Sequence, residues 1–448
     1  MTRSIPTLAA VALLSATIVA APASAATGLS PAREFVPRQV VLKLRGAPRE
    51  RIVRLRAGVG VHEAVEALRA RSRVAYAAPN YLATASDTVP LSAIANDPGP
   101  LSSPTVAPPG GWVSLQWNFL PWKVTPAAEA PASPGGIDVV GAWRNLIEAE
   151  RPGARGVVVA VLDTGVAYRD RRPGFLRSPD FTPDQFVPGY DFIGHDRLPL
   201  DTNGHGTHVA GTIAEKTDNG IGLTGIAYRA KLMPVRVLNR NGVGPAGAIA
   251  KGIRFAVAHG ADVINMSFNF PCDVNLPGVD RELLRAYYKG VVTVASIGNR
   301  YSEDCISPPA RGPHTIGVGG ATEGGCLGRY SLLPGKGVDL LAPGGGISAR
   351  GCPSVFKRSI YQVTLRMGNP GLFGEPNRYI GTSMAAAHVS GVVALVLASD
   401  VLDPKASPTQ RVGEATARLR RTARDLGLPA QRQGAGLIDA AAATEPST

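Results

Sequence analysis

The sequence predicts an α/β fold with a mostly parallel sheet covered by helices on both faces. Three observations predict it. From residue 137 onward, short apolar strand patterns alternate with helix patterns, which requires crossover connections between parallel strands. An Asp, a His and a Ser stand in Gly-rich turns at the ends of hydrophobic elements. Apolar residues make up 44% of the 448 residues and charged residues 18%, so the chain can bury a large core and is not disordered.

The expected elements follow from hydrophobic periodicity. Strands are expected over residues 157–162, 231–238, 261–268 and 291–295. Helices are expected over residues 207–214, 246–259 and 282–289, near residue 142, and from Ser383 onward. This alternation predicts one large domain over residues 116–443, with a short tail at 444–448.

The first 25 residues have the pattern of a secretory signal. Arg3 precedes an apolar run over residues 8–21, and Ala-Ser-Ala at 23–25 fits a cleavage site. No later stretch reaches about 18 uninterrupted apolar residues, so we expect no membrane span. The chain is therefore expected to be secreted, to the extracellular space or the periplasm.

Residues 26–85 predict a small separate α+β unit. A strand is expected at 39–45, a helix at 63–71, and a second strand at 74–82 that continues as an extended tail. Residues 86–115 are rich in Pro, Ser, Gly and Ala, which is typical of a linker.

The net charge of +13 does not predict nucleic-acid binding. Arg residues are scattered along the chain, and no aromatic stacking motif accompanies them. We interpret the charge as a basic surface and expect a monomer.

Asp163 and His205 are the first two candidate functional residues. Asp163 ends the apolar run GVVVAVLDTGV, and the carboxyl end of a parallel strand is where α/β proteins place their chemistry, although an Asp there can also simply start a turn. His205 opens a helix in NGHGTHVAGTIA, three residues before His208. Zinc would need a third ligand and usually a nearby Glu. Neither follows, so we interpret His205 as a base and His208 as a structural neighbour, with no metal.

Ser383 and Asn299 complete the set. Ser383 opens a helix in YIGTSMAAAHVSGVV, where unpaired N–H groups favour a developing negative charge. Taken alone, Ser383 could equally be an N-cap, and Asn299, which ends VASIGN, could be a turn residue.

These four motifs, in the order Asp163, His205, Asn299, Ser383, closely resemble the subtilisin-like serine proteases, the subtilase family, over about residues 116–443. The resemblance implies a three-layer fold and a serine endopeptidase that hydrolyses peptide bonds through an acyl-enzyme. It implies Ser383 as nucleophile, His205 as base, Asp163 as the group that orients the imidazole, and Asn299 as oxyanion donor.

The same resemblance implies a substrate groove between two chain edges. The residues of these edges are Gly242, Val243 and Gly244 on one side and Ser267, Phe268 and Asn269 on the other. Ala295, Ser296 and Ile297 would wall the first specificity pocket. No acidic residue stands in that wall, which favours apolar or broad specificity, and Phe268 could instead be a core residue. Asn269 replaces a Gly common in the family and is expected to narrow or redirect the groove.

The segment VAYAAPNY, residues 74–81, resembles the end of a subtilase propeptide. By this resemblance, residues 26–85 act as an intramolecular chaperone and inhibitor whose tail occupies the groove until it is cut. Two departures from the family stand out: Ala387 replaces a common Pro, and residues 351–378 look like an insertion without an assigned role.

Four cysteines, Cys272, Cys305, Cys326 and Cys352, allow three pairings. In an exported protein, disulfides are expected rather than metal ligation. We favour Cys272–Cys305 and Cys326–Cys352, since each closes a loop between neighbouring elements. No cofactor is expected for catalysis. Calcium is common in the family as a structural ion. No EF-hand loop is present, and ligands contributed by scattered loops cannot be identified from the sequence, so structural calcium stays open.

Three rival functions remain at this stage. The chain could be a non-catalytic relative that keeps the fold as a binding module, although all four catalytic positions are intact. It could be a protease that acts mainly on its own propeptide, or a peptide ligase built on the same residues.

Overall fold

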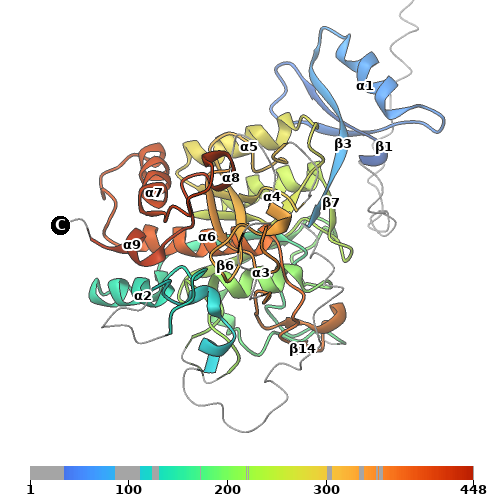
Figure 1. Ribbon diagram of the computed structural model, residues 1–448. Coiled ribbons are helices and arrows are strands. Elements are labelled where there is room, and N and C mark those ends of the chain that lie inside the picture. Colours follow the sequence, from blue (N-terminus) through green and yellow to red (C-terminus); the bar gives the residue numbers. More distant parts are fainter. Residues whose placement is uncertain are drawn as a thin grey trace, which may run out of the picture.

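The computed structural model describes residues 35–85, 111–123, 131–171, 173–217, 219, 221–299, 305–331, 338–349, 352 and 357–446. The expected signal peptide and most of the expected linker lie outside the described residues. Figure 1 shows a small N-terminal unit attached to one side of a larger helix-covered body. Within the described residues, no helix combines the length and the apolar character needed to cross a bilayer.

A seven-stranded sheet forms the centre of the larger body, and all of its strand pairs are parallel. Parallel sheets need both faces buried, which explains the nearly uninterrupted apolar strand sequences. In spatial order the strands are β12 (Leu340–Pro343), β11 (Thr315–Ala321), β10 (Val292–Ser296), β8 (Val263–Met266), β4 (Val158–Asp163), β6 (Lys231–Arg236) and β5 (Tyr190–Asp191).

Helices cover both faces of this sheet (Figure 1). Helix α4 packs against α5 on one face, and α3 packs against α6 on the other. Helix α6 is buried almost all round, because it runs through the middle of the domain against five strands. The helices are α2 (Val139–Glu148), α3 (His205–Ala214), α4 (Ala246–Ala258), α5 (Pro277–Tyr288), α6 (Thr382–Ala398), α7 (Pro408–Thr422), α8 (Ala430–Gln433) and α9 (Ala440–Thr444).

The sequence predicted this α/β architecture correctly. Every expected strand and helix of the large domain is present, with some boundaries displaced. Helix α5, for example, begins at Pro277 rather than at residue 282, because Pro is well suited to a first helical turn. Helix α7 and strands β11 and β12 were not anticipated.

The N-terminal unit is an antiparallel sheet with one helix on it. Its elements are β1 (Phe35–Leu44), β2 (Arg51–Arg54), α1 (Val61–Arg69) and β3 (Val74–Ala85). Val65 and Leu68 of α1 join Val40 and Val74 in a separate small core. The unit's sheet continues into the larger body, because β3 pairs with β7 (Val243–Pro245) and with β9 (Phe268–Asn269).

Two further regions bear on the site. Gly111–Ser114, at the end of the expected linker, forms a 3-10 turn (η4), and Trp112 packs edge-on against Trp143 of α2 at 5.8 Å. Another 3-10 turn, η5 (Trp117–Phe119), is buried. In the segment expected to be an insertion, β13 (Thr364–Leu365) and β14 (Phe373–Gly374) form a hairpin. The Thr364 hydroxyl donates to the carbonyl of Gly204, so this hairpin lies over the start of α3.

Candidate active site

Asp163 is the last residue of β4 and is completely buried. Its Oδ1 accepts a hydrogen bond from the backbone N–H of Thr164 at 2.7 Å and lies 2.8 Å from Nδ1 of His205. The chain then turns sharply at Gly165, whose φ of 106° favours glycine. The carboxylate is therefore fixed at the carboxyl end of the central strand, facing one imidazole nitrogen.

His205 is the first residue of α3, and its backbone N–H donates to Oδ1 of Asn203 at 3.0 Å. A second buried acid, Asp201, holds this turn against the Asp163 turn. One Asp201 oxygen accepts from the Thr164 hydroxyl at 2.9 Å, and the other accepts from the Thr207 hydroxyl at 2.7 Å. Sequence reasoning missed Asp201, although Asp just before a helix is a common capping pattern.

Ser383 lies in the first turn of α6, directly after Thr382, and is fully buried. Its hydroxyl donates to the carbonyl of Ser267 at 3.1 Å, and the Ser267 hydroxyl donates to the carbonyl of Ser383 at 2.8 Å. His205 lies in the first turn of α3 and Ser383 in the first turn of α6. These two helices pack against each other.

Asn299 lies beside the start of α6. Its Oδ1 accepts hydrogen bonds from the N–H and from the hydroxyl of Thr382, both at 2.9 Å. Because its oxygen is engaged there, Nδ2 is the group that can donate to an oxyanion. A Cβ on Gly381 would come within 2.6 Å of Nδ2, so glycine at this position keeps the amide uncrowded.

The two expected groove edges flank the end of β3. Leu82, Ala83 and Thr84 pair antiparallel with Pro245, Gly244 and Val243 of β7, and Thr84 and Ala85 pair with Asn269 and Phe268 of β9. Gly242 precedes β7 in a tight turn with φ of 71°. Phe268 is fully buried, with its ring edge-on to Phe270 at 6.4 Å, so its side chain is a core residue while its backbone pairs with β3.

The residues expected to wall a pocket belong to β10 and its end. Ala295, Ser296 and Ile297 are all fully buried. The carbonyl of Ser296 accepts a hydrogen bond from Nδ2 of Asn269 at 2.7 Å. These two segments, far apart in sequence, are thus joined directly at the groove.

Residues 154–436 match the profile of a protein family described as the subtilase family, and this span contains Asp163, His205, Asn299 and Ser383. The chain belongs to the subtilase family. It is a subtilisin-like serine endopeptidase by this membership, and its parallel sheet with helices on both faces is the fold expected of such a protein.

Curated relatives agree with this assignment. Subtilisin DY of Bacillus licheniformis is 32% identical over 308 residues, which cover 67% of this chain and 97% of that protein. A thermophilic serine proteinase of Bacillus sp. strain AK1 is 36% identical over 244 residues, or 54% of this chain and 53% of that protein. An extracellular protease of Xanthomonas campestris pv. campestris is 32% identical over 375 residues, which cover 76% of this chain and 57% of that protein. The chain thus spans a little over half the length of the last two relatives.

Among solved structures, a protease from Pseudoalteromonas arctica PAMC 21717 superimposes with a TM-score of 0.56 at 29% identity. The match covers 69% of this chain and 94% of that one.

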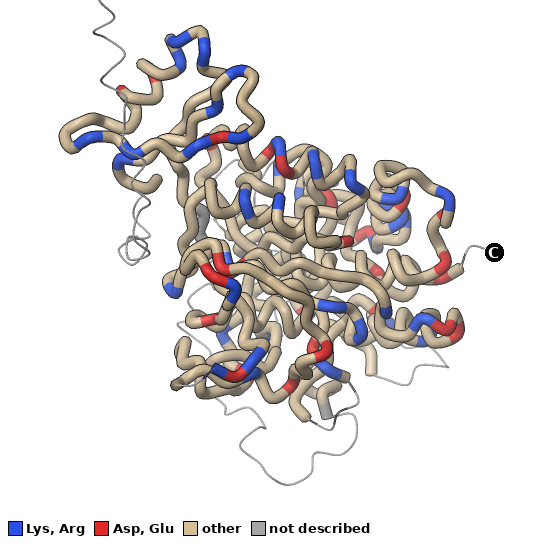
Figure 2. Tube along the Cα trace, turned by 180° about the vertical axis from the view of Figure 1, so that it is seen from behind, with Lys and Arg blue, Asp and Glu red and all other residues tan. Residues whose placement is uncertain are grey.

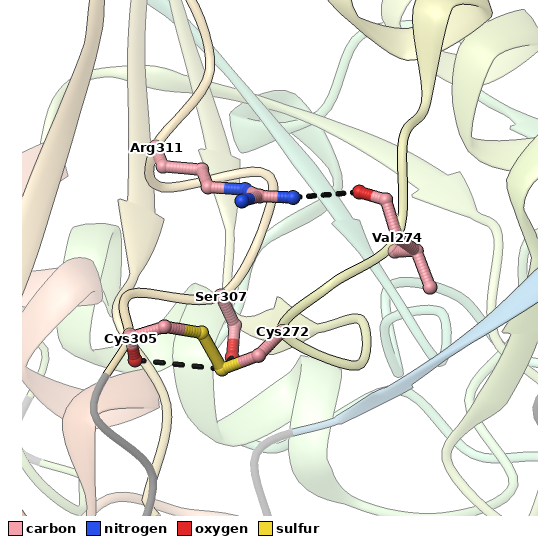
Figure 3. The surroundings of a disulfide bond; sticks show 5 residues. All are labelled: Cys272, Val274, Cys305, Ser307 and Arg311. Carbon is pink, nitrogen blue, oxygen red and sulfur yellow. Dashed lines mark hydrogen bonds between the residues drawn. A yellow bond between two sulfur atoms is a disulfide. The ribbon is translucent and has the colours of Figure 1, made fainter.

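Both predicted disulfides of this subtilase are present, Cys272–Cys305 and Cys326–Cys352. Figure 3 shows the first of them beside Ser307 and Arg311. The Arg311 guanidinium donates to the carbonyl of Val274 at 2.6 Å, so this disulfide and this hydrogen bond hold together the loops that follow β9 and β10.

His208 has the structural role expected for it. Its Nε2 donates to the carbonyl of Ile360 at 3.0 Å, and its ring stacks on Tyr379 at 4.0 Å. Burial lowers the pKa of His208 to about 3 and that of His388 to about 4, so both rings stay neutral. His208 lies on α3 with His205, and His388 lies on α6 with Ser383, so each helix that carries a candidate catalytic residue also contains a buried neutral imidazole.

A buried acidic group near the end of α3 was not foreseen. Burial raises the pKa of Asp180 to about 7, and burial together with the neighbouring Asp180 holds the pKa of Glu215 well above its usual range. Both carboxylate oxygens of Glu215 are buried, and a backbone hydrogen bond from Val363 only partly offsets the effect of burial on its pKa. Burial also raises the pKa of Glu375 to about 7. A Glu directly after the apolar end of α3 was the available sequence signal.

The described residues contain no group of three His, Cys, Asp or Glu side chains arranged to hold a metal ion. The sequence left structural calcium open, and the described residues do not test it. Along the trace in Figure 2, Lys and Arg alternate with Asp and Glu in the larger body, whereas Lys and Arg predominate in the N-terminal unit.

Proposed function

We propose that this subtilase is a secreted endopeptidase that is made with an inhibitory N-terminal unit, residues 26–85, and is activated by its removal. The observation that carries the proposal is the buried Asp163–His205 hydrogen bond of 2.8 Å at the start of α3, which packs against α6, the helix that carries Ser383 in its first turn. A buried Asp that fixes an imidazole beside a serine at a helix N-terminus is the arrangement needed for acyl transfer.

In the proposed reaction, the Ser383 oxygen attacks the carbonyl carbon of the scissile peptide bond while His205 takes the hydroxyl proton. In the structure this hydroxyl donates to Ser267, so the step requires it to donate to the imidazole Nε2 instead. Asp163 accepts the bond from Nδ1, which sets the tautomer and stabilises the imidazolium.

The negative oxygen of the tetrahedral intermediate is held by Nδ2 of Asn299 and by the N–H of Ser383. The C–N bond then breaks, and His205 gives its proton to the leaving amine. A water molecule repeats the sequence on the acyl-enzyme, with His205 again as base, and releases the carboxylic acid and the free serine.

The position of β3 supports the inhibitory role of the N-terminal unit. Its last residues lie antiparallel between β7 and β9, the path that an extended substrate would take. While they remain there, a substrate cannot pair with either edge.

The test compares the wild-type protein with Ser383→Ala, both produced with the complete N-terminal region. We expect a serine-directed fluorophosphonate to label only the wild type. We also expect N-terminal sequencing to find the secreted wild type cut between residues 82 and 116 and the variant uncut. Equal labelling of both proteins would overturn the assignment of Ser383, and equal cutting would show that another protease removes the N-terminal unit.

A further inference from the structure

We propose that Asn269, through its hydrogen bond to Ser296, restricts this subtilase to small residues on the amino side of the scissile bond. The inference rests on the proposed endopeptidase activity and adds the class of substrate to it.

The register of β3 locates the residue next to the scissile bond. Thr84 pairs with Asn269 and Ala85 with Phe268. A substrate that continues this antiparallel register places its next residue opposite Ser267. The carbonyl of Ser267 accepts the hydrogen bond from the Ser383 hydroxyl, so this position lies next to the nucleophile.

This position lies where two neighbouring parallel strands stop pairing. Strands β8 and β10 are paired as far as Met266 and Ala295. Beyond these residues β9 pairs with β3 instead, and the chain after β10 leads to Asn299 at the start of α6. A side chain of a residue held at Ser267 enters between the two diverging segments.

Asn269 and Ser296 bridge these two segments. Nδ2 of Asn269 donates to the Ser296 carbonyl at 2.7 Å, and the Ser296 hydroxyl lies 3.5 Å from both Oδ1 of Asn269 and the carbonyl of Phe268. Ser296 is fully buried. A large side chain would break the bridge and leave a buried carbonyl without its donor, whereas a small one would leave the bridge intact.

The residues of this chain at the end of β3 are consistent with a preference for small side chains. Ala83, Thr84, Ala85 and Ser86 are all small residues. A cut directly after any of residues 83–86 would follow a small side chain.

The test uses the matured protein and tetrapeptide anilides that differ only in the residue before the anilide, with Ala, Leu or Phe there. We expect the wild type to prefer Ala over Phe by about tenfold or more in kcat/KM. In Asn269→Gly the ratio of kcat/KM for the Phe substrate to kcat/KM for the Ala substrate should rise by at least about tenfold. Asn269→Asp keeps the size of the side chain but removes the donor, so it should raise the ratio in the same direction.

The matched control is Asn369→Gly, an Asn in an exposed turn outside the groove, which should leave the ratio unchanged. A wild type that cleaves after Phe as well as after Ala overturns the inference, whether or not Asn269→Gly folds. Titration with the fluorophosphonate separates this result from failure of the proposed function. An enzyme that is labelled but does not discriminate refutes only the role of Asn269, while one that is neither labelled nor active refutes the proposed function itself.

Discussion

Asn80 of the N-terminal unit accepts a hydrogen bond at Oδ1 from the backbone N–H of Gly247, at 3.1 Å, in the first turn of α4. Asn80 is buried, and its Nδ2 donates to Gln39 within its own unit at 2.8 Å. The side chain therefore satisfies one of the open N–H groups of α4 from outside the larger body. A second contact lies close by, where Arg281 of α5 donates to the Glu50 carboxylate at 3.1 Å.

We predict that Asn80→Ala weakens docking of the N-terminal unit. Loss of an N-cap partner costs about 1 kcal/mol, which corresponds to roughly a fivefold weaker inhibition constant for the cut unit. The measurement is residual peptidase activity at increasing concentrations of the unit. Arg71→Ala, an exposed position of the same unit, serves as the control and should inhibit like the wild type. Unchanged inhibition by Asn80→Ala would mean that the pairing of β3 alone holds the unit.

Asn299→Ala should lower kcat by about 10²–10³ with little change in KM, because the amide donates to the oxyanion and not to the bound substrate. Steady-state kinetics on one anilide provide both values. The Thr382 N–H loses its acceptor in this variant, so circular dichroism and thermal unfolding must show an intact fold. A rise in KM with unchanged kcat would contradict the assigned role.

Asp163→Asn should lower kcat by about 10⁴, since an amide facing Nδ1 of His205 favours the wrong imidazole tautomer. The fold should persist, because Asn has the same shape. Activity within tenfold of the wild type would show that the buried Asp163–His205 bond is only structural.

Glu215→Gln should stabilise the protein at alkaline pH. The folded-state pKa of Glu215 is raised, so its contribution to the free energy of unfolding is complete below the unfolded pKa of about 4.5 and is lost as pH rises above that value. Removing the charge should therefore raise the melting temperature at pH 8 and change it little near pH 4.

The melting temperatures for this comparison should be measured in a chelator and again in calcium, since carboxylates are calcium ligands. A higher melting temperature for Glu215→Gln in both conditions supports the interpretation that the Glu215 carboxylate is buried without a compensating positive charge. A variant that is less stable than the wild type only in calcium would show that Glu215 helps to bind the ion.

Cys326→Ser with Cys352→Ser should lower the free energy of unfolding by roughly 3–4 kcal/mol, because the bridge closes a loop with a sequence separation of 26. Chemical denaturation of both forms measures the difference. The same experiment with Cys272 and Cys305, separated by 33 residues, should give a similar loss. An unchanged free energy would indicate that the unfolded state is not constrained by the bridge.

The local sequence was sufficient for much of the fold. Apolar runs such as the one before Asp163 and the turn glycines around His205 and Ser383 specify strands and helix starts through short-range physics. The parallel sheet follows from the alternation of these elements, and Val65 and Leu68 were correctly placed in the core of the N-terminal unit. Helix α7 was missed because its apolar residues are few and its surface is strongly charged.

The sequence by itself predicted most of the element types and the order of the candidate catalytic residues, and it favoured the two cysteine pairs that the structure contains. Only the tertiary structure decided that Asn269 reaches Ser296, that Asp201 joins two turns, and that the Glu215 carboxylate is buried beside Asp180. These relationships join residues from different elements, and their distances depend on how strands diverge and helices pack. A hydrophobic pattern specifies which face of an element is buried, but not which polar atoms meet there.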